Sequence, residues 1–286
     1  MNRGNNFIEA TLKCQKCGAE FQGKIYLCLS HKIPQQVCPQ CSEKILEQER
    51  KEEEMQRQTE IASIRKIWRE NCGIDPKYMG EDFSTFDTKR SGNINEIYKK
   101  CVDYAEQFPI QYDQWLRRAK KPYPSLLLFS VGVWGNGKTH LVSAIAHRIF
   151  DRWQGEHVAC PVHLISEPEL YGRIQQTFNY TYAEREEKQS EQDIINHLCK
   201  VRLLIIDDLG KQPRRDMDFV RRTMFDIINR RYKAMLPVVI TTNKDTEGLR
   251  DYLGSATDEA TLDRIIEMTE GKFSQVKGTS YRRIKK

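Results

Sequence analysis

The sequence lacks any apolar run long enough to cross a membrane, because no stretch reaches the ~18 uncharged apolar residues that a transmembrane helix requires. The residues after Met1 lead into no apolar segment of the kind found in secretory signals. The net charge is only +6, from 46 basic and 40 acidic residues, which permits nucleic-acid binding without demanding it. These absences predict a cytoplasmic protein that makes no membrane contact.

The composition nevertheless supports a folded core. Hydrophobic residues make up 39% and aromatic residues 9% of the 286 residues, which argues against wholesale disorder. The length is about twice the commonest domain size of ~100–150 residues. We therefore expect either one large domain with a small appendage or two domains.

The nine cysteines are unevenly spread, and without an export signal they argue against a disulfide framework. Four of them form two CxxC pairs, Cys14 with Cys17 and Cys38 with Cys41. Each turn lets two thiolates converge on one ion, and two turns supply the tetrahedral set that Zn²⁺ prefers. The spacing predicts a structural zinc-ribbon-like module. Redox cysteines are the alternative, and Cys28 or His31 stays open as a replacement for one ligand.

The segment after these cysteines, residues 42–71, contains no glycine or proline and is rich in good helix formers. It predicts a charged, solvated helical linker, whose end could pack through Ile61, Ile64 and Trp68. Gly73 and Pro76 end it. We therefore divide the chain into a zinc-binding module (1–41), a helical linker (42–71) and a third domain (72–286).

A phosphate-binding loop follows a short apolar strand, predicted over residues 125–130. Residues 132–139 match GxxxxGK[ST] in full and lead into a predicted helix over residues 140–150. In this motif backbone N–H groups surround phosphates, the lysine reaches the β- and γ-phosphates and the hydroxyl binds Mg²⁺. A chance glycine-rich turn is the alternative. The predicted nucleotide-binding residues are Gly132, Gly135, Asn136, Gly137, Lys138, Thr139 and His140.

A second apolar strand, residues 201–210, ends in two carboxylates. Asp207 occupies the position of an aspartate that, with Thr139, would hold Mg²⁺. Asp208 follows where a carboxylate would orient the attacking water, although it could instead cap the next turn.

Two further strands are predicted over residues 161–166, followed by a helix through Phe178, and over residues 237–243. Asn243 ends the latter strand, where it would contact the water or the phosphate. Alternating strands and helices predict a doubly wound parallel α/β domain with its ligands at the carboxyl ends of the strands.

Together these segments resemble the DnaC/IstB-like family of AAA+ ATPases, which comprises helicase loaders and transposition helpers. The resemblance covers about residues 72–283. The matching stretches are GVWGNGKTHL, SEPELYGRIQQTF, LLIIDDLG, DIINRRY, LPVVITTN, LDRIIEM and GTSYRR, with Cys72 to Tyr78 and then Phe83 and Phe86 before them. The resemblance implies an AAA+ P-loop NTPase fold that binds ATP and Mg²⁺ and hydrolyses ATP.

Site residues follow from the same resemblance. It makes Lys138 and Thr139 the Walker A pair, Asp207 and Asp208 the Walker B pair and Asn243 the sensor. Arg264 resembles a trans-acting arginine finger, which would require a homo-oligomer. Arg230 or Arg231 is a second candidate for this role, and Arg264 could instead pair with Glu267 or Glu270 on its own helix.

The resemblance also implies a function. A zinc module ahead of the ATPase favours a replicative helicase loader that engages a DnaB-type helicase and single-stranded DNA. Tyr171, Arg173 and Phe178 lie where similar loaders meet such DNA, and residues 211–233 and 277–286 are locally basic. The alternative is an IstB-like transposition helper that acts on double-stranded DNA with a transposase. A small-molecule kinase and a non-hydrolysing zinc adaptor fit the complete Walker motifs less well.

Overall fold

The structure is a computed structural model that describes residues 7–28, 31–111, 122–154, 159–181, 184, 187–211, 216–254 and 259–281. The chain divides into two compact units, Met1–Ser63 and Ile64–Lys286. We refer to them below as the N-terminal unit and the ATPase unit.

The N-terminal unit begins with a small antiparallel sheet of β1 (Phe7–Lys13), β2 (Glu20–Cys28) and β3 (His31–Pro34). The register pairs Lys13 with Glu20, so β1 and β2 form a hairpin that closes beside the first CxxC turn. In residues 7–41, apart from 29 and 30, only Cys14, Gly23 and Cys38 are buried. Apolar burial alone therefore contributes little to the stability of this sheet.

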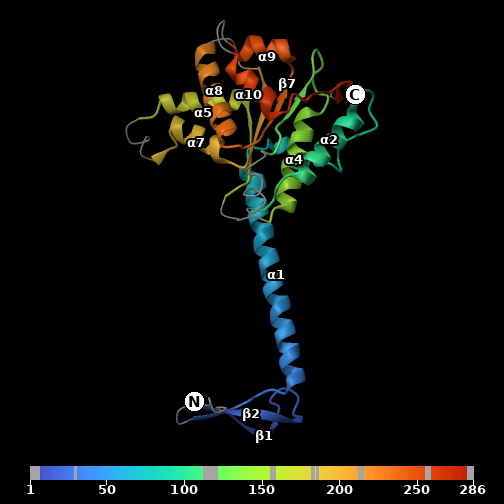
Figure 1. Ribbon diagram of the computed structural model, residues 1–286, viewed down its shortest axis with the longest axis vertical. Helices are drawn as coiled ribbons and strands as arrows, with labels where there is room; N and C mark the ends of the chain where they lie inside the picture. The colour runs from blue at the N-terminus through green and yellow to red at the C-terminus, as the bar shows by residue number, and fades with distance from the viewer. Residues whose placement is uncertain are drawn as a thin grey trace. The chain divides into compact units, whose positions relative to one another are not determined.

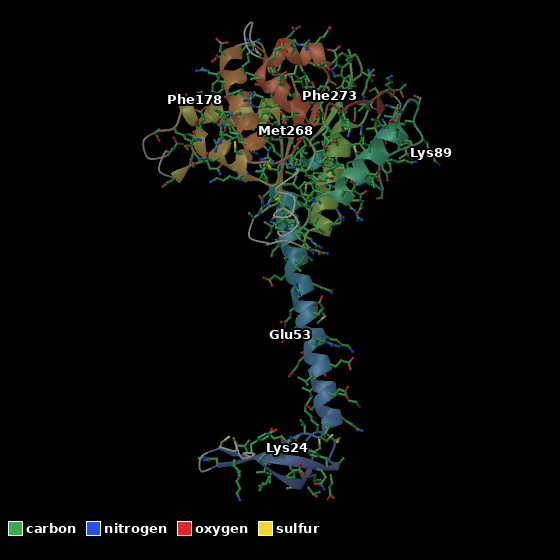
Figure 2. The ribbon with its side chains drawn as sticks, in the orientation of Figure 1. Lys24, Glu53, Lys89, Phe178, Met268 and Phe273 are labelled. Carbon is green, nitrogen blue, oxygen red and sulfur yellow. The ribbon has the colours of Figure 1, made fainter. Side chains whose placement is uncertain are left out.

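Helix α1 (Pro39–Asn71) contains the predicted linker and begins within the second CxxC turn. Its side chains around Glu53 are exposed, as expected for a solvated helix (Figure 2). Its last two turns differ, because Trp68 is buried in the ATPase unit with its ring centroid 6.0 Å from that of Phe150. Ile64 packs against the same cluster. The expected packing of the end of this helix is therefore observed for Ile64 and Trp68.

The ATPase unit is built on a five-stranded parallel sheet. The strands are β4 (Leu126–Phe129), β5 (Val162–Ser166), β6 (Leu203–Leu209), β7 (Val238–Thr242) and β8 (Phe273–Gln275). Their order is β5-β6-β7-β4-β8, and every pairing is parallel. All strand carboxyl ends therefore meet at one edge of the sheet, where the Walker residues lie.

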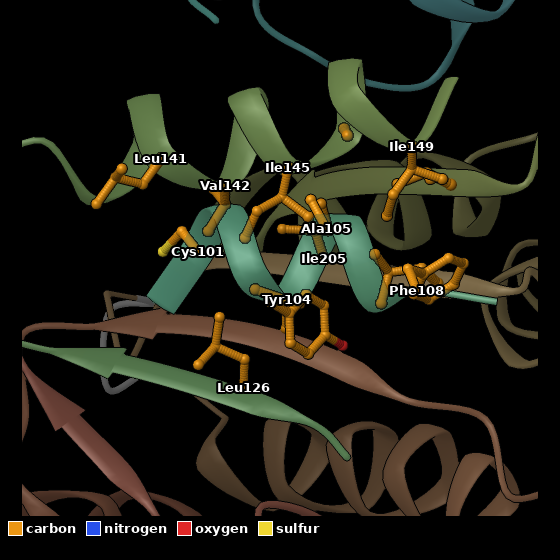
Figure 3. Packing of buried hydrophobic residues seen from close by; sticks show 14 of the residues in the cluster. Cys101, Tyr104, Ala105, Phe108, Leu126, Leu141, Val142, Ile145, Ile149 and Ile205 are labelled. Carbon is orange, nitrogen blue, oxygen red and sulfur yellow. The ribbon is translucent and has the colours of Figure 1, made fainter. Parts of the chain in front are cut away.

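Helices cover both faces of this sheet (Figure 1). On one face pack α2 (Ile94–Gln107) and α4 (Lys138–Arg152), against side chains such as Leu126 and Ile205 (Figure 3). On the other face Leu204 and Ile206 of β6 contribute to a second apolar cluster. The helices that contribute to it are α5 (Glu167–Phe178), α7 (Glu191–Lys200), α8 (Met217–Lys233), α9 (Thr246–Leu253) and α10 (Ala260–Met268).

Alternate residues of one strand thus belong to different clusters, which explains why these strands are apolar throughout. The predicted doubly wound parallel α/β fold is confirmed. The proposed boundaries 1–41, 42–71 and 72–286 differ from the division into compact units, which falls inside α1. Among the helices of the described residues, none has both the length and the apolar character needed to span a bilayer.

Candidate nucleotide site and cysteine cluster

The phosphate-binding loop joins β4 to α4 and depends on glycine at three positions. Gly132, Gly135 and Gly137 all have positive φ, at 71°, 75° and 101°. At Gly137 a Cβ atom would lie 2.8 Å from the ring of Phe86, so the left-handed backbone and the close packing both require glycine. Gly137 caps α4, whose first N–H groups therefore face the loop interior.

Lys138 is 5% exposed, and its ammonium group donates to three side-chain oxygens. These are Asn243 Oδ1 at 2.9 Å, Ser130 Oγ at 2.5 Å and Asn136 Oδ1 at 3.2 Å. Burial lowers the pKa of Lys138 to about 8, partly opposed by the carboxylates of Asp208 and Asp207. The structure thus brings Lys138 and Asn243 together, and it adds Ser130, which is not among the predicted site residues.

Asp207 lies at the centre of a second set of contacts. Its Oδ2 accepts a hydrogen bond of 2.9 Å from Thr139, and its Oδ1 accepts one from Thr241. Burial and the neighbouring Asp208 raise its pKa. Hydroxyl and carboxylate oxygens at this distance form a donor set suited to Mg²⁺, which is a hard cation that prefers oxygen ligands. The residues present therefore fit the expected metal.

Asp208 occupies an uncommon backbone conformation, with φ at 59°. The pairing of β6 with β7 is irregular between Ile206 and Leu209, and the N–H of Asp208 donates to Thr241 Oγ1 at 2.9 Å. The carboxylate of Asp208 forms an ion pair with Lys211. Left-handed backbone in a non-glycine residue is costly and persists where surrounding contacts enforce it. Here those contacts direct Asp208 toward the cavity beside Lys138.

This cavity has a volume of about 300 Å³ and lies over the phosphate-binding loop. That volume falls within the range of about 300–1,000 Å³ typical of small-molecule sites. One wall comes from residues before α2, where the guanidinium of Arg90 lies over the ring of Phe86, 5.0 Å from its centroid. Tyr281 also lines the cavity, with its ring centroid 5.5 Å from the Arg90 guanidinium, and its N–H donates to Gly135 O at 2.9 Å.

His140 contributes to the wall formed by the residues before α2, although the sequence predicts that it binds the nucleotide. Its Nδ1 lies 3.0 Å from a carboxylate oxygen of Glu81, and its Nε2 lies 2.8 Å from the carbonyl oxygen of Asp82. Its ring packs edge-on against Phe86 at 4.9 Å. His140 lines the cavity while both of its nitrogens face the segment before α2.

The arginine candidates differ in how they are held. Arg231 is fully buried, and its guanidinium donates to backbone carbonyls that include Leu198 O at 2.6 Å. It cannot reach a neighbouring subunit. Arg264 is half-buried, lies over the rings of Phe225 and Tyr232 and donates to Ala260 O at 2.8 Å. A trans-acting role for Arg264 stays a prediction.

Three residues are predicted to contact DNA, and for Tyr171 this prediction is wrong. Its side chain is fully buried, and its hydroxyl donates to Val220 O at 2.9 Å, so it cannot stack on a base. Arg173 is exposed and paired with Glu169 at 2.6 Å. Phe178 is 53% exposed at the end of α5, at the periphery of the ATPase unit (Figure 2). Residues 212–215 and 282–286 of the two basic stretches lie outside the described residues.

The four CxxC cysteines converge in the N-terminal unit. Their sulfur atoms all lie within 4.8 Å of one another. The Sγ atoms of Cys17 and Cys38 are 3.8 Å apart, which matches the edge of ~3.8 Å expected for a tetrahedron with Zn–S bonds of ~2.3 Å. The N–H of Cys38 donates to Cys14 Sγ at 3.3 Å, and such bonds lower the pKa of Cys14 to about 6. The donor set therefore fits zinc.

The alternative ligands lie elsewhere in the sheet. Cys28 and His31 pair across β2 and β3, and both are exposed. Within the described residues, the group of metal-ligating side chains in this unit consists of Cys14, Cys17, Cys38 and Cys41. The geometry thus favours the two CxxC pairs over any set that includes Cys28 or His31.

One family model and several known proteins match this chain. The family model described as IstB-like ATP binding protein matches residues 125–286, which is more than half of the chain. The replicative helicase loader DnaC of Escherichia coli K12 is 25% identical over 193 residues, 68% of this chain. The match spans 66% of that relative, just under two thirds of its length.

Solved structures show the same fold. The crystal structure of the DnaC helicase loader matches with a TM-score of 0.52 at 19% identity, covering 71% of this chain and 100% of that chain. A putative primosome component from Streptococcus pyogenes serotype M3 matches with a TM-score of 0.51 at 19% identity, covering 73% and 93%. These solved structures therefore share the α/β fold predicted from the sequence.

Proposed function

Because this chain belongs to the family of IstB-like ATP-binding proteins and is an AAA+ ATPase, we propose that it is an ATP-dependent loader of a DnaB-type replicative helicase. The observation that carries this proposal is the similarity to the helicase loader DnaC, which extends over 193 residues. The cysteine module ahead of the ATPase supports it, since a small module on a helical linker is suited to holding a partner protein.

In the proposed reaction, this chain binds the triphosphate of ATP through the loop between β4 and α4. Lys138 exchanges its three side-chain oxygens for phosphate oxygens, and Asn243 stays beside the γ-phosphate. Thr139 and Asp207 would hold Mg²⁺, which supplies charge neutralisation of the phosphates when bound. Asp208 orients the attacking water while Lys211 holds its carboxylate.

For the N-terminal unit we propose a structural zinc ion held by Cys14, Cys17, Cys38 and Cys41. Such an ion cross-links the turn of the β1–β2 hairpin to the N-terminal end of α1. All four positions are taken by the protein, so the ion has a structural role.

Single-stranded DNA is the proposed nucleic-acid ligand. Arg173 and Phe178 are exposed on α5 and supply a cation and an aromatic ring, the combination that favours backbone contact and base stacking. Arg264 is the proposed trans-acting arginine of a homo-oligomer, which forms when the protein engages its partner.

Co-purification with the replicative helicase of the same cell or phage tests the loader function. We expect the intact chain to retain the helicase in the presence of ATP, and a Cys14→Ser/Cys17→Ser variant to lose it, because the module that holds the partner then lacks two zinc ligands. Lys138→Ala is the matched control for the ATPase unit, since it leaves the module intact. Failure of the intact chain to retain any replicative helicase would contradict the proposal.

A transposition helper is the second candidate, favoured by the match to the IstB-like family model. The two candidates differ in the DNA that stimulates ATP hydrolysis. A loader is expected to respond to single-stranded oligonucleotides. Stronger stimulation by double-stranded DNA, together with capture of a transposase, would instead establish the second candidate.

A further inference from the structure

A buried carboxyl group lies beside the nucleotide site without belonging to either Walker motif. Glu167 is the first residue of α5 and is fully buried. Its Oε2 accepts hydrogen bonds from the N–H groups of Gly210 at 2.7 Å and Lys211 at 3.0 Å. Its Oε1 accepts one from the hydroxyl of Tyr252 at 2.8 Å. A carboxyl group buried in this way is tolerable only because donors surround it.

These donors come from two other parts of the chain. Gly210 and Lys211 belong to the loop that follows β6, and Tyr252 lies on α9. One side chain therefore joins α5, α9 and the loop at the carboxyl edge of the sheet. Gly210, which has a φ of 93°, and Lys211 lie beyond the end of β6, so these hydrogen bonds hold the described start of the loop.

The anchored loop is the one that directs Asp208. Glu167 holds the backbone of Lys211, and the Lys211 ammonium group pairs with the Asp208 carboxylate. Asp208 itself has left-handed backbone. A shift of the loop would therefore move the carboxylate that orients water, while the Lys138 contacts, which come from other elements, would persist.

We propose that Glu167 is a positioning residue for ATP hydrolysis, which fixes the loop after β6 and thereby the orientation of Asp208. It touches no substrate and acts through the backbone N–H groups of Gly210 and Lys211. The proposal rests on ATP hydrolysis at the site described above, and it does not depend on which partner or DNA the protein engages.

Three substitutions at Glu167 distinguish the effect of side-chain length from the effect of the carboxylate charge. In Glu167→Gln the side chain keeps its length, its oxygen accepts from the loop and its amide donates to Tyr252. Glu167→Asp keeps the carboxyl but is one methylene too short to span both partners. Glu167→Ala removes the anchor. We expect kcat to fall about tenfold or more in the Asp and Ala variants and to stay within about threefold in the Gln variant.

A positioning role for Glu167 is identified by a fall in kcat that leaves nucleotide binding unchanged. KM and the dissociation constant of a fluorescent ADP analogue should stay within about twofold in every folded Glu167 variant, because phosphate binding uses other residues. Glu106→Ala is the control, since it removes a carboxylate that pairs with Arg148 and Arg152 on the surface of the same unit. Its kcat should equal that of the wild type.

Turnover is measured without helicase or DNA, so failure of the proposed loader function would leave this test unaffected. If the Ala variant does not fold, the comparison of Asp with Gln decides. Wild-type kcat in Glu167→Asp would overturn the proposal. A parallel loss of kcat and nucleotide affinity in Glu167→Asp, or a Gln variant as slow as the Asp variant, would overturn it as well.

Discussion

Lys138 shows how much a single residue depends on its surroundings. The motif predicts a lysine that reaches phosphates, and the structure shows what holds its charge before they arrive. Ser130, Asn136 and Asn243 supply three oxygens, yet burial still lowers the pKa of Lys138 to about 8. The phosphates of a bound nucleotide offer Lys138 full negative charges in place of these neutral oxygens. Binding should therefore raise this pKa again.

We predict that nucleotide binding takes up a proton at alkaline pH. Below pH 8 Lys138 is already protonated in the free protein, so binding leaves its charge unchanged. Above pH 8 the free protein has lost that proton, and binding ADP must restore it, so affinity falls as pH rises. Calorimetry in buffers of different ionisation enthalpy should show uptake approaching one proton per bound ADP at about pH 9. Mg²⁺ is omitted so that Asp207 does not contribute to the measured uptake.

Measurement at pH 6.5 provides the control, because Lys138 is charged there in both states and no uptake is expected from it. An affinity that stays constant from pH 7 to pH 9.5 would contradict this prediction.

A motif that fixes both residue type and spacing predicts Lys138, Thr139 and Asp207, and the structure brings Thr139 and Asp207 into contact. Thr241 and Glu167 were not predicted, although Thr241 donates to Asp207 and Glu167 accepts from the N–H groups of Gly210 and Lys211. Thr241 looks like an ordinary β-branched strand residue, and Glu167 looks like an ordinary acidic residue in a first helical turn. Their contacts depend on which strands are neighbours in the sheet, and the residues adjacent in sequence do not reveal this order.

At the scale of elements, strands and their helices were the most predictable part, because buried parallel strands are apolar throughout and end in polar residues. The strand expected over residues 161–166 and the helix to Phe178 correspond to β5 and α5. Strand β8 was not expected, since it has only three residues and depends on its pairing with β4. The prediction that Tyr171 contacts DNA was wrong because an aromatic residue on a helix is compatible with both a surface and a core position.

The segment between α1 and α2 shows how a single glycine allows two elements to join. The N–H of Leu164 in β5 donates to Cys72 O at 2.7 Å, so the chain docks beside this outer strand. Gly73 then turns with a φ of 86°. A Cβ atom there would lie 1.9 Å from Leu164 O, which is a backbone atom that cannot move aside.

We predict that Gly73→Ala lowers the free energy of unfolding by about 2–4 kcal/mol, because left-handed backbone and a clash with Leu164 O add together. Urea unfolding of the full chain measures this. Gly172→Ala is the matched control, because it lies in α5 with open space around its Cβ position. It should raise stability by about 0.5–1 kcal/mol through helix propensity. Equal stabilities of the two variants would refute the argument.

At the scale of the whole molecule, the two compact units are stabilised in different ways. The ATPase unit has two extensive apolar clusters, one on each face of its sheet. The N-terminal unit has no comparable cluster among its described residues, and two of the three that are buried are the cysteines Cys14 and Cys38. The apolar clusters stabilise the first, whereas we expect the second to depend on the proposed zinc ion.

Zinc removal should therefore affect one unit and leave the other unchanged. We expect one zinc ion per freshly purified chain, and its loss in Cys14→Ser/Cys17→Ser. Zinc binding supplies folding free energy of about 10–16 kcal/mol in comparable small modules, so residues 7–41 should lose amide-exchange protection in this variant. Protection of the β6 amides and ATP turnover without partners should stay within about twofold of the wild type, because Asp207 and Lys138 lie in the other unit.

Cys28→Ser is the matched control, since it removes an exposed thiol of the same sheet that lies outside the cysteine cluster. It should retain zinc and protection throughout residues 7–41. Metal-free wild-type protein would contradict the zinc assignment. Loss of β6 protection together with that of the small sheet would instead show that the two units fold as one, and stability could then no longer be assigned to each unit by its own burial.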